Sequence, residues 1–405
     1  MSRPPGATDA RPPRAWIVAS PSLAPVEIWG LSPTERLRRC LDRAGCGPIR
    51  ALAAGDAAEP PHEGLCLVAR ADRIYDERLI EALAKAPGTM LVDPANGAAQ
   101  GEPVAACVEA ERFSEALEWI RQRRSGVPPG LRGVPPRELA SGYIAALRKF
   151  EPAYLYPAHP ENAREVEART FDAAYKGATD LVTKWLWPRP ARAATRWLAS
   201  RAVQPNTVTL ASWVLAIAAG WLFAVGAFGP GLVLAWLMTF LDTVDGKLAR
   251  VTLRSSQFGH VLDHSLDLLH PPFWWFAWGW GSGAPFAPET WIVVAGYLVG
   301  RLEEGLFLLA FGFEMHCWWP IDGLFRTITA RRNPNLLLLS VGTLGGRPDL
   351  GLAMVALWTV ASLGFHAVRI AQAFAARARG REVRPWDEAS APALRQSGAK
   401  VEARG

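Results

Sequence analysis

The amino-acid sequence predicts an α/β N-terminal cytosolic domain followed by an all-α polytopic membrane domain. Short apolar runs alternate with helix-like stretches in the first third of the chain, whereas long apolar segments dominate the second half. Half of the 405 residues are hydrophobic and 20% are charged, which fits a soluble part joined to a membrane part. The expected domains are 1–130, a linker and helical connector at 131–183, the membrane domain at 184–378 and a disordered tail at 379–405.

The first domain has the alternation of a parallel sheet covered by helices. Strands are expected at the apolar runs 16–19, 65–69, 90–92 and 104–108, and helices at 34–44, 77–86 and 114–122. Strands that alternate with helices favour this architecture. Ser32 and Glu35, on either side of Pro33 and Thr34, have the spacing of a capping box, so a helix is expected to begin there.

Six transmembrane helices and one interfacial helix are expected in the second domain. The approximate spans are 206–225, 231–250, 256–279, 289–311, 322–344 and 350–374. The fifth is the weakest, because three arginines occupy its first half, and part of it is expected to project into the cytosol. Residues 184–201 alternate tryptophans with lysines and arginines, as an amphipathic helix in the membrane interface does, although a basic soluble helix has the same composition.

Charge and tryptophan patterns predict how this domain is oriented. The loops near 226–230 and 281–288 carry no lysine or arginine, whereas the opposite helix ends are rich in arginine. The positive-inside rule therefore places both termini on the cytoplasmic side of a multi-pass protein of the inner (cell) membrane. An aromatic belt is expected at the far interface, formed by Trp274, Trp275, Trp278 and Trp280.

The net charge and the cysteine content limit the classes of partner and metal site that the sequence predicts. The formal net charge is +6, carried mostly by arginine, which indicates either anionic lipid or nucleotide partners or a coding bias. No nucleic-acid partner is expected. The five cysteines form no C-x-x-C pair, so the sequence predicts neither a zinc site nor a disulfide framework.

A cluster of acids inside the apolar region carries the strongest functional signal. The acids are Asp242, Asp245, Asp263 and Asp267. The first two are three residues apart and the last two are four apart, so each pair lies on one face of a helix. Carboxylates this close repel one another unless cations neutralise them, and acids at membrane depth usually face a functional cavity. All-oxygen ligation favours Mg²⁺ or Mn²⁺ over zinc. The alternative is a polar helix hairpin with solvated or paired acids.

The residues between the acids suit a phosphate-bearing ligand. Gly246, Ala249 and Gly259 remove side-chain bulk, so a ligand can lie close to the backbone. Arg250 supplies a planar fork of donors. A non-enzymatic, cation-dependent membrane transporter is the competing class, since it would use the acids for ions but would need neither the glycines nor Arg250.

This string resembles the CDP-alcohol phosphotransferase signature D-x2-D-G-x2-A-R-x8-G-x3-D-x3-D at every defined position, and the likeness covers about 184–376. Pro205, Asn206 and Thr209 are similar to the P-N-x-x-T start of that family's first membrane helix. The resemblance implies transfer of a substituted phosphate from a CDP-alcohol to an alcohol or phospho-alcohol acceptor, with release of CMP. It also implies contact with membrane lipids and a homodimer.

The same resemblance implies roles for individual residues. Asp242, Asp245 and Asp263 would hold the metal, and Asp267 would lie near a second ion and accept the acceptor's proton. The expected contacts of the CDP moiety are Asn206, Thr209, Gly246, Ala249, Arg250 and Gly259. Asn206 and Thr209 could instead cap their helix.

Other polar residues have two readings each. The expected acceptor-binding residues are Arg301, Arg331 and Arg332, of which the last two could equally be anchors at the interface. His260 and His264 could ligate the metal or lie at the cavity edge.

The N-terminal domain resembles a shortened, degenerate nucleotidyltransferase domain. Residues 30–36 stand where that family has its G-x-G-x-R loop, and Asp72 lies in a segment similar to its metal-binding turn. The second glycine and a P-K pair are missing. The layout is similar to bifunctional enzymes that make CDP-inositol and then di-myo-inositol phosphate phosphate. We expect this domain to be no longer a working cytidylyltransferase and to have a docking or stabilising role. Arg36 and Asp72 could also be solvated surface charges.

Overall fold

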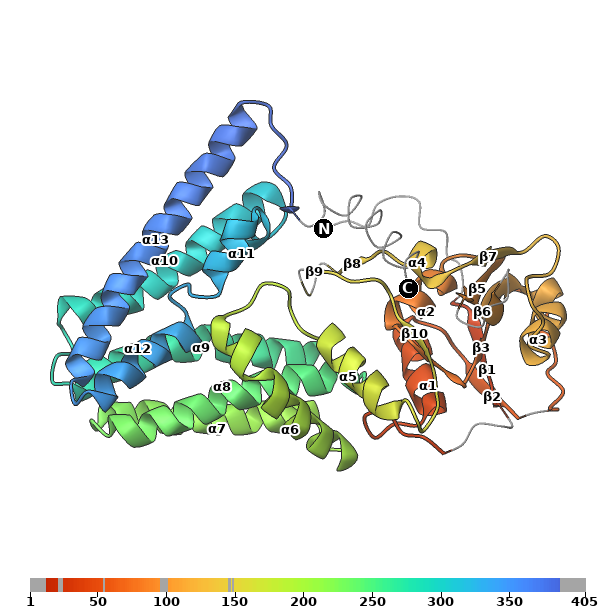
Figure 1. Ribbon diagram of the computed structural model, residues 1–405, viewed down its shortest axis with the longest axis horizontal. Coiled ribbons are helices and arrows are strands. Elements are labelled where there is room, and N and C mark those ends of the chain that lie inside the picture. Colours follow the sequence, from red (N-terminus) through yellow and green to blue (C-terminus); the bar gives the residue numbers. More distant parts are fainter. Residues whose placement is uncertain are drawn as a thin grey trace. The chain divides into compact units, whose positions relative to one another are not determined.

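The computed structural model describes residues 12–20, 25–53, 55–94, 101–144, 147 and 149–386 (Figure 1). The chain divides into two compact units. The first consists of Met1–Ile144 and Glu151–Ala173, and the second of Ala145–Phe150 and Ala174–Gly405. Most of the tail expected to be disordered, from residue 387 onward, lies outside the described residues.

The first unit is built on a six-stranded mixed sheet with the order β2-β1-β3-β6-β5-β7. The strands are β1 (Arg14–Val18), β2 (Ile49–Leu52), β3 (Leu65–Arg70), β5 (Thr89–Asp93), β6 (Glu102–Glu109) and β7 (Arg132–Val134). β1 is parallel to β2 and β3, but β6 runs antiparallel to both of its neighbours. The expectation of a parallel sheet is therefore wrong at β6. The connection from Asp93 to Glu102 is too short for the crossover that a parallel neighbour needs.

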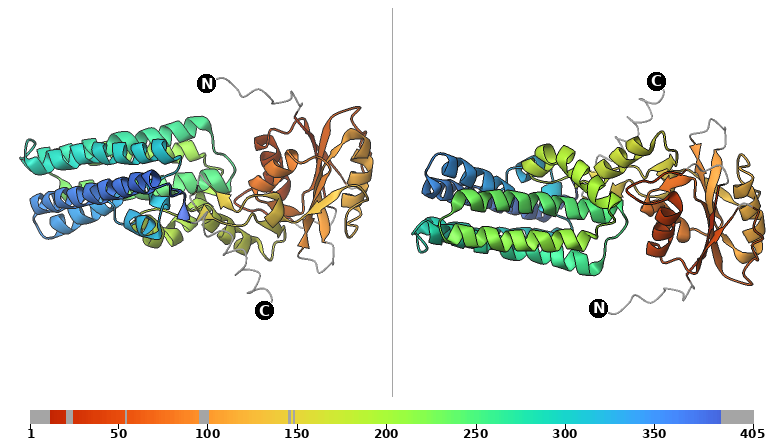
Figure 2. Two further views of the ribbon diagram at one scale, coloured as in Figure 1. Left: turned by 90° about the horizontal axis from the view of Figure 1, so that it is seen from above. Right: turned by 90° about the horizontal axis from the view of Figure 1, so that it is seen from below.

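Helices cover both faces of this sheet (Figures 1 and 2). α1 (Pro33–Arg43) and α2 (Glu77–Ala84) contact each other on one face, and α3 (Phe113–Arg121) packs against β3 and β6 on the other. α1 begins as predicted, because the Ser32 side chain accepts a hydrogen bond from the Glu35 backbone N–H at 3.2 Å.

The first unit continues beyond residue 130, through the region expected to be a connector. β7 closes one edge of the sheet, a short α4 follows (Pro136–Leu139), and β10 (Leu155–Pro157) pairs antiparallel with β4 (Arg73–Tyr75). α5 (Ala163–Ala173) is held by Trp29, whose Nε1–H donates to Thr170 Oγ1 at 2.8 Å. The Trp29 backbone N–H donates to Glu167 Oε1 at 3.1 Å. These buried contacts tie the connector residues into the first unit.

The second unit is helical. Its helices are α6 (Pro188–Ser200), α7 (Pro205–Ala224), α8 (Phe228–Val251), α9 (Gln257–Gly281), α10 (Pro288–Phe311), α11 (Pro320–Arg326), α12 (Arg332–Leu344) and α13 (Pro348–Ala378). The fifth expected span is broken into α11 and α12, because Pro334 has no backbone N–H and fits only in the first turn of a helix. By length and composition, α7 and α13 are the two helices of the described chain that meet the criteria for crossing a membrane.

The segment expected to lie in the membrane interface forms the π-helix η4 (Val182–Leu186) followed by α6. Trp185 and Trp197 are exposed, whereas Ala191 and Ala199 are buried. The segment thus has an apolar exposed face and a small-residue packing face. Its location in a membrane interface stays a prediction.

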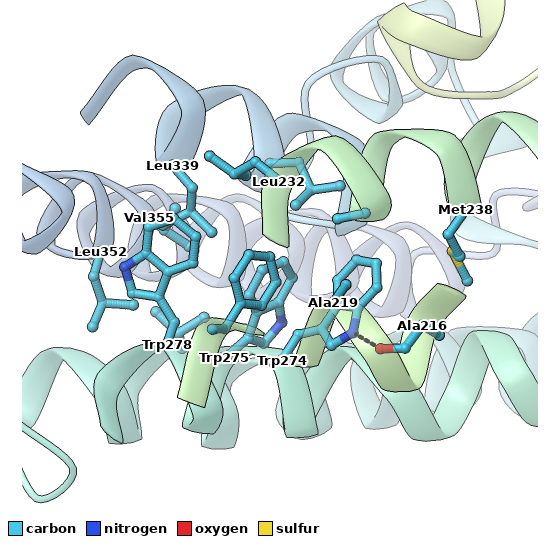
Figure 3. Close-up of a cluster of buried hydrophobic side chains, with 14 of the residues drawn as sticks. Ala216, Ala219, Leu232, Met238, Trp274, Trp275, Trp278, Leu339, Leu352 and Val355 are labelled. Carbon is cyan, nitrogen blue, oxygen red and sulfur yellow. Dashed lines mark hydrogen bonds between the residues drawn. The ribbon is translucent and has the colours of Figure 1, made fainter. Parts of the chain in front are cut away.

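The core of the second unit contains tryptophans that were expected at its surface (Figure 3). Trp274, Trp275 and Trp278 are 1%, 0% and 0% exposed, while Trp280 is 55% exposed, so the aromatic belt is wrong for the first three. The Trp274 Nε1–H donates to the Ala216 carbonyl of α7 at 2.8 Å. Because Gly220 leaves room for this ring, α7 and α9 can pack closely. A buried indole with a satisfied N–H is a stable core residue.

Candidate functional site

The four predicted aspartates lie on two consecutive helices, as expected. Asp242 and Asp245 belong to the last turns of α8, and Asp263 and Asp267 to the first half of α9. Both helices pack against α7. The side chains of Asp263 and His260 lie outside the described residues.

Asp242 and Asp267 meet at Arg332, the first residue of α12. The Arg332 Nη1–H donates to Asp267 Oδ1 at 2.8 Å, and Nη2–H donates to Asp242 Oδ2. Arg332 was expected to bind the acceptor. In this structure it instead bridges two predicted metal ligands from different helices. Opposite charge at this distance relieves the repulsion between the carboxylates.

Asp245 has a different partner. It is buried, and its Oδ2 accepts a hydrogen bond from the Thr209 hydroxyl of α7 at 2.6 Å. α7 begins after Gln204 and has no side-chain cap, so the capping alternative for Asn206 and Thr209 is wrong. Thr209 therefore orients an aspartate of the acidic motif.

The small residues of the motif make room for neighbouring polar groups. A Cβ at Gly259 would lie 2.6 Å from Asn206 Oδ1, closer than atoms pack. A Cβ at Gly246 would lie 3.2 Å from Arg250 Nη2. The Arg250 Nε–H donates to the Ala174 carbonyl at 3.1 Å, which ties the segment before η4 to α8.

A polar cavity of about 310 Å³ opens beside these residues. Its described charged lining has seven cations and three acids: Lys176, Lys247, Arg250, Arg301, Arg326, Arg331 and Arg332 against Asp180, Asp242 and Asp267. Of the six residues expected to contact the donor, Gly246 and Arg250 line it, whereas Asn206, Thr209, Ala249 and Gly259 do not. Contact with a donor stays a prediction. The excess of positive charge suits an anionic ligand.

The predicted acceptor residues lie at the Asp267 side of this cavity. Arg301 and Arg331 both pair with Glu304 of α10, and both also line a smaller cavity of about 80 Å³ that includes Asp267. The Tyr297 hydroxyl donates to the Asp267 backbone carbonyl at 2.8 Å, and the Arg301 Nε–H contacts the Tyr297 oxygen at 3.3 Å. The three predicted arginines thus lie around Asp267.

Several lining residues escaped the sequence analysis. Lys176 and Asp180 lie far from the motif in sequence, and no local pattern marks them. The Asn333 amide donates to Asp180 Oδ1 at 2.9 Å, which links the segment before η4 to α12. Lys247 stands at a variable position of the motif, so the one available signal was its charge inside an apolar helix.

The residues present fit a hard divalent cation by the chemistry of their donors. Asp242 and Asp267 offer carboxylate oxygens, which such ions prefer, and they already surround a guanidinium cation. Among the described side chains, no group of three or more His, Cys, Asp or Glu residues is close enough to hold a metal. Metal binding therefore stays a prediction.

In the first unit, arginines neutralise Asp72, the residue predicted to remain from a metal-binding turn. It bonds to Arg70 through Nε at 3.0 Å and to Arg123 through Nη2 at 2.8 Å, and Arg73 lies 3.5 Å away. Burial raises the pKa of Asp72, but the hydrogen bond and charge of Arg70, with the charges of Arg73 and Arg123, lower the pKa below its usual value overall. Arg36 is also buried, with its Nη2 3.3 Å from the Tyr154 hydroxyl. The reading of both residues as solvated charges is wrong.

The chain thus joins an α/β unit to a helical unit whose acidic helix pair borders a cationic cavity. Residues 202–319 match the family model for CDP-alcohol phosphatidyltransferase.

Three relatives share parts of the chain. A bifunctional IPC transferase and DIPP synthase from Rubrobacter xylanophilus is 29% identical over 58% of this chain and 53% of the relative. A phosphatidylinositol phosphate synthase from Mycobacteroides abscessus is 34% identical over 19% of this chain and 39% of the relative. An archaetidylinositol phosphate synthase from Pyrococcus horikoshii is 34% identical over 20% of this chain and 43% of the relative. The chain thus spans about half the length of the first relative and less of the other two.

Proposed function

We propose that the helical unit transfers a substituted phosphate from a CDP-alcohol to an acceptor hydroxyl and releases CMP, in the synthesis of phospholipids or other polar lipids. The observation that carries this proposal is the cationic cavity bordered by Asp242 and Asp267 of the complete signature. Phosphoryl-type transfer depends mainly on positioning and on charge stabilisation, which such a cavity supplies.

The chain's own residues divide the work as follows. Asp242, Asp245 and Asp263 would hold Mg²⁺ or Mn²⁺, with Asp267 beside them. When bound, such an ion would supply positive charge against the pyrophosphate and the charge that develops on CMP. Asp267 accepts the proton of the acceptor hydroxyl. The hydroxyl oxygen forms a bond to phosphorus, and the bond between that phosphorus and CMP breaks. Arg332 bridges Asp242 and Asp267 and lines the cavity, so its guanidinium can pair with a substrate phosphate there.

The acceptor that fits best carries its own phosphate. Arg301 and Arg331 lie beside Asp267, so a phosphate held there would place a neighbouring hydroxyl near the base. Two relatives are named as inositol phosphate lipid synthases, which supports a phosphorylated polyol as the acceptor class.

The proposed topology has six membrane spans, with both termini and the cavity on the cytoplasmic side. The apolar helices α7 and α13 support a membrane location. α7 also exposes Val214, Ile217 and Trp221 along one side, as a lipid-facing helix would. We propose a homodimer on family resemblance alone.

A bifunctional enzyme that also makes its own CDP-alcohol is the second candidate, because the relative with the longest alignment carries two activities in its name. The arginines around Asp72 argue against it. A carboxylate already paired with three cations is a poor ligand for the metal that holds a nucleoside triphosphate. We therefore propose a docking or stabilising role for the first unit. The family match argues against a transporter.

The test uses the full chain in detergent. We expect CMP release from CDP-diacylglycerol or CDP-inositol, with inositol 1-phosphate or glycerol 3-phosphate as acceptor, only when Mg²⁺ or Mn²⁺ is present. CMP release that survives thorough chelation contradicts the metal assignment. Pyrophosphate release from CTP and inositol 1-phosphate, lost in Asp72→Ala, would establish the bifunctional alternative.

A further inference from the structure

Lys247 is a buried cation that the acidic motif does not account for. It lies on α8 between Asp245 and Arg250, is 4% exposed, and lines the 310 Å³ cavity. Its Nζ lies 3.7 Å from the ring centroid of Tyr175. The aromatic face therefore fixes where the ammonium points.

No side chain in the described part of the chain forms a salt bridge with Lys247. Its charged neighbours include the cations Arg250, Lys176 and Lys149 and the acid Asp245. One carboxylate oxygen of Asp245 already accepts a hydrogen bond from the Thr209 hydroxyl. A buried ammonium is costly unless an anion accompanies it, and adjacent cations increase that cost.

A phosphate group would satisfy this arrangement. An ammonium is a compact point charge that binds phosphate oxygens from any direction. Gly246, the residue before Lys247, presents no side chain to the same cavity, so an anion can approach α8 closely. The ring of Tyr175 covers one side of the ammonium, and Lys247 also lines the polar cavity.

We propose that Lys247 binds the pyrophosphate of the donor and that Tyr175 positions the Lys247 ammonium. Both residues would then position the substrate, although neither is a defined position of the signature. This inference rests on the proposed function, because it assigns a role within the same cavity. The Arg250 bond to the Ala174 carbonyl holds the residue next to Tyr175 against α8.

The experiment compares the binding of CDP and cytidine to the full chain in detergent with Mg²⁺, by equilibrium dialysis. Lys247→Met should weaken CDP binding by roughly 10- to 100-fold, the effect expected for losing a charged hydrogen bond, and leave cytidine binding unchanged. Lys247→Arg should restore most of the loss. Lys184→Met is the matched control, because Lys184 also lies over an aromatic ring, at 5.3 Å from Trp185, but is exposed.

A second variant covers the case in which Lys247→Met does not fold. Tyr175→Leu keeps the charge and removes the aromatic face, so it should weaken CDP binding several-fold and not cytidine binding. Equal loss of both ligands, or unchanged CDP binding in folded variants, overturns the inference while the proposed function stands. A parent protein that binds no CDP at all overturns the proposed function itself.

Discussion

The hydrogen bond from Thr209 to Asp245 allows a precise test of the acidic site. Thr209→Val keeps the shape of the side chain and removes the hydroxyl that donates to Asp245 Oδ2 at 2.6 Å. Both residues are buried, so water cannot replace the lost donor. Losing a hydrogen bond to a charged group costs about 1.5–3 kcal/mol. If that cost falls on the metal-bound state, the affinity for the ion drops by roughly 10- to 100-fold, as for other partners of metal ligands.

The assay is a Mn²⁺ titration of the purified full chain by electron paramagnetic resonance, with CMP release measured across the same metal concentrations. Ser212→Ala is the control, because Ser212 is buried one turn along the same helix and donates within it, to Val208 at 3.1 Å. Mn²⁺ affinity equal to that of the parent in Thr209→Val refutes the reasoning. A change confined to the KM for the donor would instead show that Thr209 contacts the nucleotide.

Further predictions concern Asp267 as the catalytic base, the closely packed Gly259 and the contribution of Asp72 to stability in acid. Asp267→Asn should retain donor binding and lose about 10²–10⁴ in turnover, measured as CMP release, and parent-like turnover removes Asp267 as the base. Gly259→Ala should lower thermal stability and activity, because its Cβ would meet Asn206 Oδ1 at 2.6 Å, whereas Gly305→Ala, with nothing within 4 Å, should be neutral or stabilising. The lowered pKa of Asp72 contributes stability that is present above the ordinary aspartate pKa and is lost as the pH falls through the lowered value. Acid unfolding followed by circular dichroism should therefore shift in Asp72→Asn, and an unchanged acid transition contradicts the linkage.

The parts of the structure that sequence predicted well depend on short-range spacing. The positions of Asp242 and Asp267 on consecutive helices follow from the helical repeat, and the start of α1 follows from the Ser32 cap. Both signals lie within a few residues of the feature they predict.

The errors arose where the answer depends on distant partners. Tryptophans at helix positions 274 and 278 can face lipid or a neighbouring helix. Here the Trp274 Nε1–H donates to the Ala216 carbonyl of α7, and the Trp278 Nε1–H donates to the Pro348 carbonyl at the start of α13. The role of Arg332 could not be seen because its partners are 65 and 90 residues away. The direction of β6 follows from the short connection between β5 and β6, which the alternation of strands and helices does not reveal.

The break between α11 and α12 has a consequence for how substrates of unlike solubility meet. α12 has 13 residues, which at 1.5 Å per residue is about 20 Å, shorter than the roughly 30 Å hydrocarbon layer. In the proposed topology, no continuous helix therefore spans the hydrocarbon layer beside Arg331 and Arg332. In that topology, the polar cavity lined by Arg331 and Arg332 would give a water-soluble reactant a path to a lipid that stays in the bilayer.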